Sequence, residues 1–174
     1  MALAIASMVS ACGGNDSGPS PVVPNYAGNW SGNYVITGCS QTGGIALANV
    51  CRLLGTSATY SFSLTQSSRN VAGSFGLGSV SFPNTGGAVA TDGSLALSGT
   101  AISDGVTVVV NWALTLATTA LAGTVSQQFT STVLSGQANL VGTISTANRT
   151  ALLTAPSAIG PRTLGDFVRG MTVR

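Results

Sequence analysis

Residues 106–116, which read VTVVVNWALTL, carry the pattern that decides the fold. Every even position holds a large apolar residue, whereas the odd positions hold Thr, Val, Asn, Ala and Thr. Because successive side chains of a strand point to opposite faces, this alternation predicts a strand with one buried and one wetted face. Strands of this kind are typical of antiparallel sheets.

The same alternation occupies most of residues 26–146, which we take as one domain. Turn signals separate the segments, and the pairs Asp92-Gly93 and Asp104-Gly105 suit type I′ turns, which need positive φ. Because all links are short, we expect an all-β fold, an antiparallel up-and-down β-barrel of about eight strands without exposed edges. The expected strands cover residues 28–37, 58–66, 70–77, 79–82 with 87–91, 94–102, 105–117, 120–130 and 134–146, and PNTGG at 83–87 is an expected turn.

The composition excludes several kinds of chemistry. The 174 residues include six Arg and four Asp but no Lys, Glu or His, and charged residues make up 6% of the chain. Without His there is no Ser-His-Asp triad and no His-based zinc site, and without Lys there is no Schiff-base or P-loop lysine. A net charge of +2 is too small for a broad nucleic-acid footprint. We therefore expect a protein that is not an enzyme and that uses no cofactor, metal or nucleic acid.

Residues 1–11, MALAIASMVSA, are apolar, and a Gly/Ser/Pro-rich stretch follows them. Such a run is shorter than the ~20 residues of a membrane span but suits the apolar region of a signal peptide. The sequence VSAC at 9–12 resembles the lipobox of bacterial lipoproteins. The resemblance implies cleavage before Cys12, a lipid on its sulfur, residues 12–25 as a flexible tether, and anchoring to the outer membrane of a bacterial envelope. A signal peptide needs a basic residue before its apolar run, and none is present, so we expect the true start upstream of Met1. The alternative to a signal peptide is a buried N-terminal helix.

The cysteine count fits an envelope protein. Three Cys is an odd number, and if Cys12 carries the lipid, Cys39 and Cys51 remain as a pair. A disulfide between them would close a short loop, stabilise the fold by ~2–3 kcal/mol and require an oxidising compartment. The alternative is two free, buried thiols.

Gly28-Asn29-Trp30 opens the first expected strand and resembles the Gly-x-Trp signature of the calycin superfamily, which includes lipocalins, avidins and small periplasmic inhibitors. The resemblance implies a lipocalin-like barrel in which Trp30 closes the base. It also implies an Arg that packs over this Trp, and Arg149 is the candidate by position. Biotin binding is not expected, because avidins use several Trp and place Asn where this chain has Gly32.

Five residues fall on the inward face of the expected strands and are candidates to line a cavity. Gln127 is the clearly polar member, and a buried amide needs a hydrogen-bond partner. It either touches a ligand or satisfies a local backbone bulge, and the aromatic members either line a cavity or pack as core. The candidates are Tyr34, Tyr60, Phe62, Trp112 and Gln127.

Three functions are open. The first is a non-catalytic envelope lipoprotein whose barrel binds a small apolar ligand, which the small inward-facing glycines favour because they leave space. The second is a protease or lysozyme inhibitor or another protein-interaction module, which would use the 39–51 loop or the 13–25 tether as its contact. The third is a structural lipoprotein of the cell surface. An outer-membrane barrel would show the same alternation, but aromatic residues make up 6% of the chain, too few for two aromatic girdles.

Residues 147–174 form a tail with four of the six Arg. Thr163 and Asp166 resemble a capping box, and apolar residues follow at helical spacing up to Met171. Either a short helix over 163–171 packs against the barrel, or this tail frays.

Overall fold

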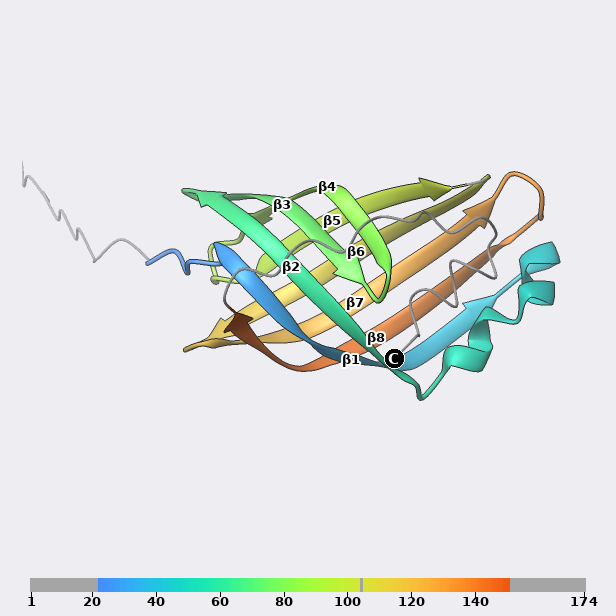
Figure 1. Ribbon diagram of the computed structural model, residues 1–174, viewed down its shortest axis with the longest axis horizontal. Coiled ribbons are helices and arrows are strands. Elements are labelled where there is room, and N and C mark those ends of the chain that lie inside the picture. The colour runs from blue at the N-terminus through green and yellow to red at the C-terminus, as the bar shows by residue number, and fades with distance from the viewer. Residues whose placement is uncertain (1–21, 104, 151–174) are drawn as a thin grey trace, which may run out of the picture.

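The computed structural model describes residues 22–103 and 105–150. They form a closed barrel in which eight antiparallel strands follow one another in chain order (Figure 1). The predicted up-and-down barrel is therefore confirmed, whereas the expected signal peptide, Cys12 and the expected helix at 163–171 lie outside the described residues. The strands are β1 Gly28–Gln41, β2 Ser57–Ser67, β3 Asn70–Leu77, β4 Val80–Val89, β5 Leu95–Ser103, β6 Val106–Ala117, β7 Ala120–Ser131 and β8 Gln137–Thr150.

Strand β6 shows how the alternation becomes a barrel wall. Its even-numbered residues from Val106 to Leu114 are buried, while Asn111 and Thr115 are exposed. Inward-facing apolar side chains of all eight strands join in one hydrophobic core inside the barrel. Burial of each large apolar side chain contributes ~1.5–3 kcal/mol, so this core is the main source of stability.

One expected turn is wrong. Residues 83–87, PNTGG, continue strand β4. Phe75 of β3 pairs with Phe82, and Gly73 pairs with Thr85, so the register shifts between these two pairs. A β-bulge at this point accommodates the proline, which has no N–H to donate to the ladder.

Strands β1 and β8 are both longer than expected, and their pairing closes the barrel. Strand β1 ends at Gln41, and β8 runs to Thr150, so that Arg149 belongs to the barrel wall. The ladder between them extends from the pair Asn29–Thr150 to the pair Gln41–Ala138. Closure of this kind leaves no exposed strand edge.

Two 3-10 helices occupy the connection between β1 and β2, where the sequence suggested a loop. They are η1 Gly43–Ala48 and η2 Val50–Leu53, and Figure 1 shows them at the end of the barrel opposite the entry of the chain into β1. We call residues 42–54 the lid, because its buried side chains join the core at that end. These side chains are Ile45, Val50 and Leu53. Within the described part of the chain, no helix is long and apolar enough to cross a membrane.

Two inward-facing glycines make room for aromatic rings. A Cβ at Gly99 would lie 2.6 Å from Cε1 of Phe75, and a Cβ at Gly142 would lie 2.8 Å from Cδ2 of Tyr34. Any other residue at these positions would have to displace the ring, so both positions favour Gly. The expectation that inward glycines leave space for a ligand is therefore wrong at these two positions, because rings fill that space. Gly123, with φ +150°, instead lies at a register shift between β7 and β8.

Candidate functional site

An aromatic cluster lies inside the barrel, with Trp112 at its centre. The Trp112 ring centroid lies 4.8 Å from that of Phe62, 5.3 Å from that of Tyr60 and 6.3 Å from that of Tyr34. Aromatic pairs at such distances stabilise a core by ~0.5–1.5 kcal/mol each beyond their buried area. The structure thus brings together the four aromatic residues that the sequence placed on the inward face.

The cluster also includes two rings that are not among the predicted cavity-lining residues. Phe75 and Phe82 stack with their centroids 4.4 Å apart, and Phe75 also contacts Trp112 edge-on at 5.6 Å. Both occupy inward positions of the same alternation, so that alternation would have found them.

Gln127 is buried in the barrel and donates a hydrogen bond from Nε2 to the hydroxyl oxygen of Tyr34, at 3.0 Å. Strand β7 keeps a regular register with β8 from Gly123 to Thr130, so no bulge lies at Gln127. The alternative in which this amide satisfies a backbone bulge is therefore wrong. Its partner is a side chain on β1.

Three buried polar atoms of this cluster have no hydrogen-bond partner among the described residues. They are the hydroxyl of Tyr60, Nε1 of Trp112 and Oε1 of Gln127. The residues that carry them are at most 2% exposed. An unpaired buried polar atom costs ~1–3 kcal/mol, and native proteins keep few of them.

The unpartnered atoms belong to one region of the interior. The rings of Tyr60 and Trp112 are in contact. Trp112 on β6 pairs with Val125 on β7, and Gln127 is the next inward-facing residue after Val125. Two donors and two acceptors are thereby available in this region, because a hydroxyl can act as either.

The interior is electrically neutral in the described part of the chain. Burial raises the pKa of Tyr34 to about 12, although the hydrogen bond from Gln127 works in the opposite direction. Burial also raises the pKa of the Tyr60 hydroxyl. Both phenols therefore stay protonated at physiological pH and act as neutral groups. Among the described residues, the buried polar ones are Thr85 and Gln127, and neither carries a charge.

The base of the barrel, where β1 begins, is closed by a structural contact. Trp30 is fully buried and donates from Nε1 to the carbonyl oxygen of Tyr26 at 2.9 Å. The Arg149 guanidinium lies over the Trp30 ring, 4.9 Å from its centroid, and also donates to the carbonyl oxygen of Asn25. Arg149, the candidate by position, is thus the residue that packs over Trp30. Gly28 begins β1 with φ +121°, a conformation that favours glycine.

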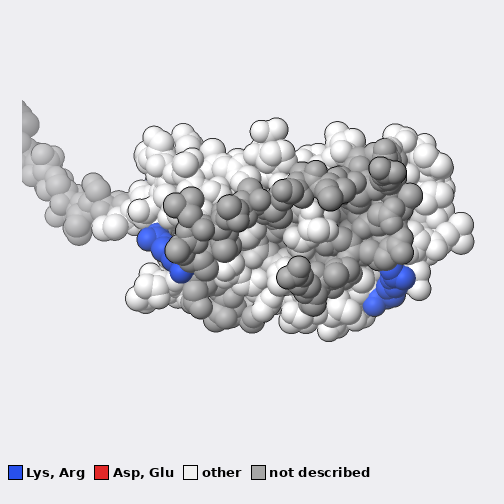
Figure 2. Space-filling view, viewed as in Figure 1, with Lys and Arg blue, Asp and Glu red and all other residues white. Residues whose placement is uncertain are grey.

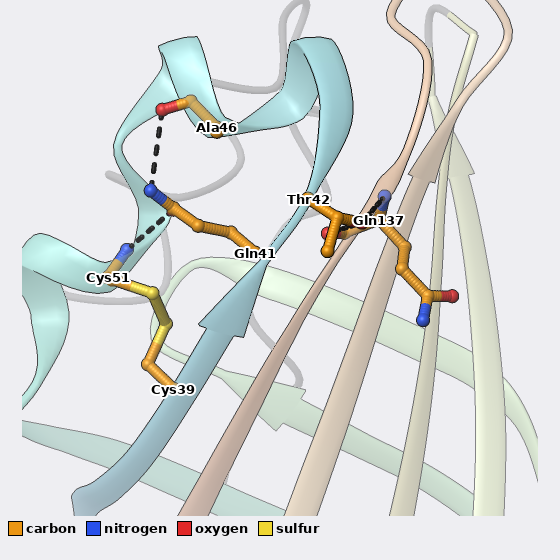
Figure 3. The surroundings of a disulfide bond; sticks show 6 residues. All are labelled: Cys39, Gln41, Thr42, Ala46, Cys51 and Gln137. Atoms are coloured by element: carbon orange, nitrogen blue, oxygen red, sulfur yellow. Dashed lines mark hydrogen bonds between the residues drawn. A yellow bond between two sulfur atoms is a disulfide. The ribbon is translucent and has the colours of Figure 1, made fainter.

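The opposite end is braced by the disulfide Cys39–Cys51, which confirms the predicted pairing and excludes two free thiols. Figure 3 shows how Gln41 supports the same loop. Its Oε1 accepts from the backbone N–H of Cys51 at 3.2 Å, and its Nε2 donates to the carbonyl of Ala46 at 3.4 Å. The lid is thus fixed to β1 by one covalent bond and a bridging amide.

The outer surface is also poor in charge. Figure 2 shows two separate Arg patches on one face and no acidic patch. Large apolar side chains are exposed at the lid end: Leu47 of η1 is 86% exposed, Val133 in the β7–β8 connection 82%, and Ile102 near the end of β5 73%. These residues cannot be identified from the sequence alone, because exposure at a barrel end depends on the fold.

The sequence has no significant match to models of known protein families or to curated proteins. Fold and site together define a closed, disulfide-braced, eight-stranded antiparallel barrel with a neutral aromatic interior.

Proposed function

We propose that the protein is a non-catalytic binding barrel of the bacterial cell envelope, held to the outer membrane by a lipid on Cys12, whose interior holds a small and largely apolar molecule. One observation carries the proposal: the three unpartnered polar atoms of Tyr60, Trp112 and Gln127 inside the aromatic cluster. Phe and Leu would fill the same positions without that energetic cost. A bound molecule that completes these hydrogen bonds accounts for the choice of residues.

The surroundings of the three atoms support a mostly apolar molecule. Val110 and Leu140 lie directly opposite Gln127 on the neighbouring strands, and both are buried. Apolar walls with a few placed polar groups are typical of small-molecule sites. The chain also lacks the usual general acids and bases, His, Glu and Lys, so binding without catalysis fits its composition.

Native mass spectrometry of the protein purified from bacterial envelopes tests the proposal. The expected result is a mass excess over the lipidated chain that disappears after organic extraction. The variant Cys12→Ser is the control for the lipid, since it removes the anchor and leaves the barrel intact. A bare mass, together with no binding of fatty acids or hydrophobic dyes, would contradict ligand binding.

A second candidate is a protein-interaction module, and the exposed apolar side chains at the lid end favour it. Leu47, Ile102 and Val133 come from three different segments. These segments are linked by backbone hydrogen bonds, from Ile45 N–H to the Ser135 carbonyl at 3.0 Å and from Thr132 N–H to the Gly105 carbonyl at 2.8 Å. Exposed apolar groups that cluster are typical of protein interfaces.

Affinity capture from envelope extracts separates the two candidates. An interaction module predicts a stoichiometric partner that is lost in the double variant Leu47→Ser, Val133→Ser. Val22→Ser is the matched control, because Val22 is 92% exposed and precedes β1 at the base. Equal capture by all three proteins would argue against an interface at the lid end.

A further inference from the structure

Resting on the proposed function, we infer that the molecule held in the barrel is uncharged and carries a hydrogen-bond acceptor beside a hydrogen-bond donor on an apolar frame, as a primary carboxamide does. The acceptor bonds to Nε1–H of Trp112, and the donor bonds to Oε1 of Gln127. Each of these atoms is buried and unpartnered among the described residues.

The chemistry of each atom fixes what its partner must be. The Trp112 indole N–H can donate but not accept, so the ligand must offer an acceptor. Oε1 of Gln127 can accept but not donate, so the ligand must offer a donor there. The hydrogen bond from Nε2 of Gln127 to Tyr34 orients the amide and leaves its oxygen free. The Tyr60 hydroxyl can complete either kind of bond.

Charge is excluded by the surroundings. Among the described charged residues, Arg52, Asp92 and Arg149 are exposed and Arg69 is half-buried, and the buried residues of the described chain carry no charge. An ion moved into this interior would lose its hydration without gaining a counter-ion, which strongly disfavours binding. A carboxylate or an ammonium group of the same shape should therefore bind much more weakly than a neutral amide.

Four probes of nearly the same shape test the inference: benzamide, benzoate, benzamidinium and toluene. Titrations followed by NMR report both binding and location, because the chain has two Trp indole N–H groups. Trp112 Nε1 is unpartnered, whereas Trp30 Nε1 already donates to Tyr26 and serves as an internal control. The expected result is that benzamide binds at least about tenfold more tightly than each other probe and shifts the Trp112 indole signal but not that of Trp30.

Two variants locate the donor and acceptor contacts. Gln127→Leu should weaken benzamide binding about tenfold and leave toluene binding unchanged. Gln128→Leu is the matched control, because Gln128 is the next residue of β7 and faces outward. Tyr60→Phe removes one hydroxyl oxygen and is a second, milder variant. It should also weaken benzamide binding. Circular dichroism confirms that each variant is folded.

The outcomes separate this inference from the proposed function. Toluene or benzoate binding as tightly as benzamide would overturn the chemical class and leave a ligand-binding barrel in place. Benzamide binding that is the same in Gln127→Leu and Gln128→Leu would overturn the assigned contacts. If none of the four probes binds and the purified protein also shows its bare mass, the inference and the proposed function both fail.

Discussion

Gln127 and Tyr34 lie 93 residues apart in the chain and are joined inside the barrel by a hydrogen bond of 3.0 Å from Nε2 to the phenol oxygen. Their strands, β7 and β1, are not neighbours, because β8 lies between them. The bond therefore fixes two side chains across the interior, beyond the order set by backbone pairing. A buried bond of this kind stabilises a fold by ~0.5–1.5 kcal/mol.

Tyr34→Phe removes the acceptor of that bond and leaves Nε2 of Gln127 unpartnered. We expect the free energy of unfolding to fall by ~1–2 kcal/mol. Gln127→Leu should lower the free energy of unfolding by less than Tyr34→Phe does, because it also removes the unpartnered Oε1. In urea unfolding, the double variant should lose less than the sum of the two single variants. Strictly additive losses would show that the two side chains do not interact.

Unlike Tyr34→Phe, Tyr60→Phe should not lower the free energy of unfolding of the ligand-free protein. The Tyr60 hydroxyl has no partner among the described residues, so its removal loses no hydrogen bond. The expected free energy of unfolding is unchanged or higher by about 1 kcal/mol. Tyr34→Phe is the natural comparison, because the Tyr34 hydroxyl is bonded. A loss equal to that of Tyr34→Phe would count against an unpartnered Tyr60.

Stability should fall at alkaline pH because of the buried phenols. Burial raises the pKa of Tyr34 from 10.0 to about 12, so the folded state holds this proton more tightly than the unfolded chain does. The resulting stabilisation is fully present below pH 10.0 and is lost as the pH rises towards about 12.

Unfolding measured between roughly pH 8 and pH 12 checks this dependence, with ultraviolet absorbance reporting phenolate formation. Tyr34→Phe should make the alkaline decline shallower, because one group fewer contributes. Phenolate formation in the folded protein at the ordinary tyrosine pKa would refute the prediction.

Removing the disulfide should loosen the lid selectively. We expect the double variant Cys39→Ala, Cys51→Ala to lose ~2–3 kcal/mol of stability. Hydrogen exchange should speed up at the Ile45 amide, which bonds to the Ser135 carbonyl across the lid end. The Tyr26 amide at the base, bonded to Oε1 of Gln66, is the control and should change little beyond the global effect. Equal acceleration at both ends would show that the disulfide does not act locally.

Period-two alternation was sufficient to predict the barrel, since it depends on local strand geometry. It predicted β3 at residues 70–77 with the observed bounds. It failed at residues 83–87, because Pro and Gly signal a turn unless a neighbouring strand supplies a bulge. The lid could not be predicted either, because 3-10 helices are short and lack a clear apolar period.

Alternation predicts which side chains face inward but not which of them touch. Alternation placed Tyr34, Tyr60, Trp112 and Gln127 on the inward face, and all four are buried. The contacts among them depend on the stagger of the strands around the closed barrel, and this stagger cannot be deduced from the sequence of a single strand. For the same reason the sequence could not show that the Tyr34 ring packs against Gly142.

The pairing of β1 with β8 affects how the chain folds. The partners in this ladder, such as Asn29 and Thr150, come from opposite ends of the described chain. Contacts of such high sequence separation slow folding, because a long loop must close first. During synthesis, β1 keeps one unpaired edge until residues 137–150 emerge, and an unpaired edge can join another chain. The edge of β1 therefore stays open to mispairing until the last strand of the barrel has been made.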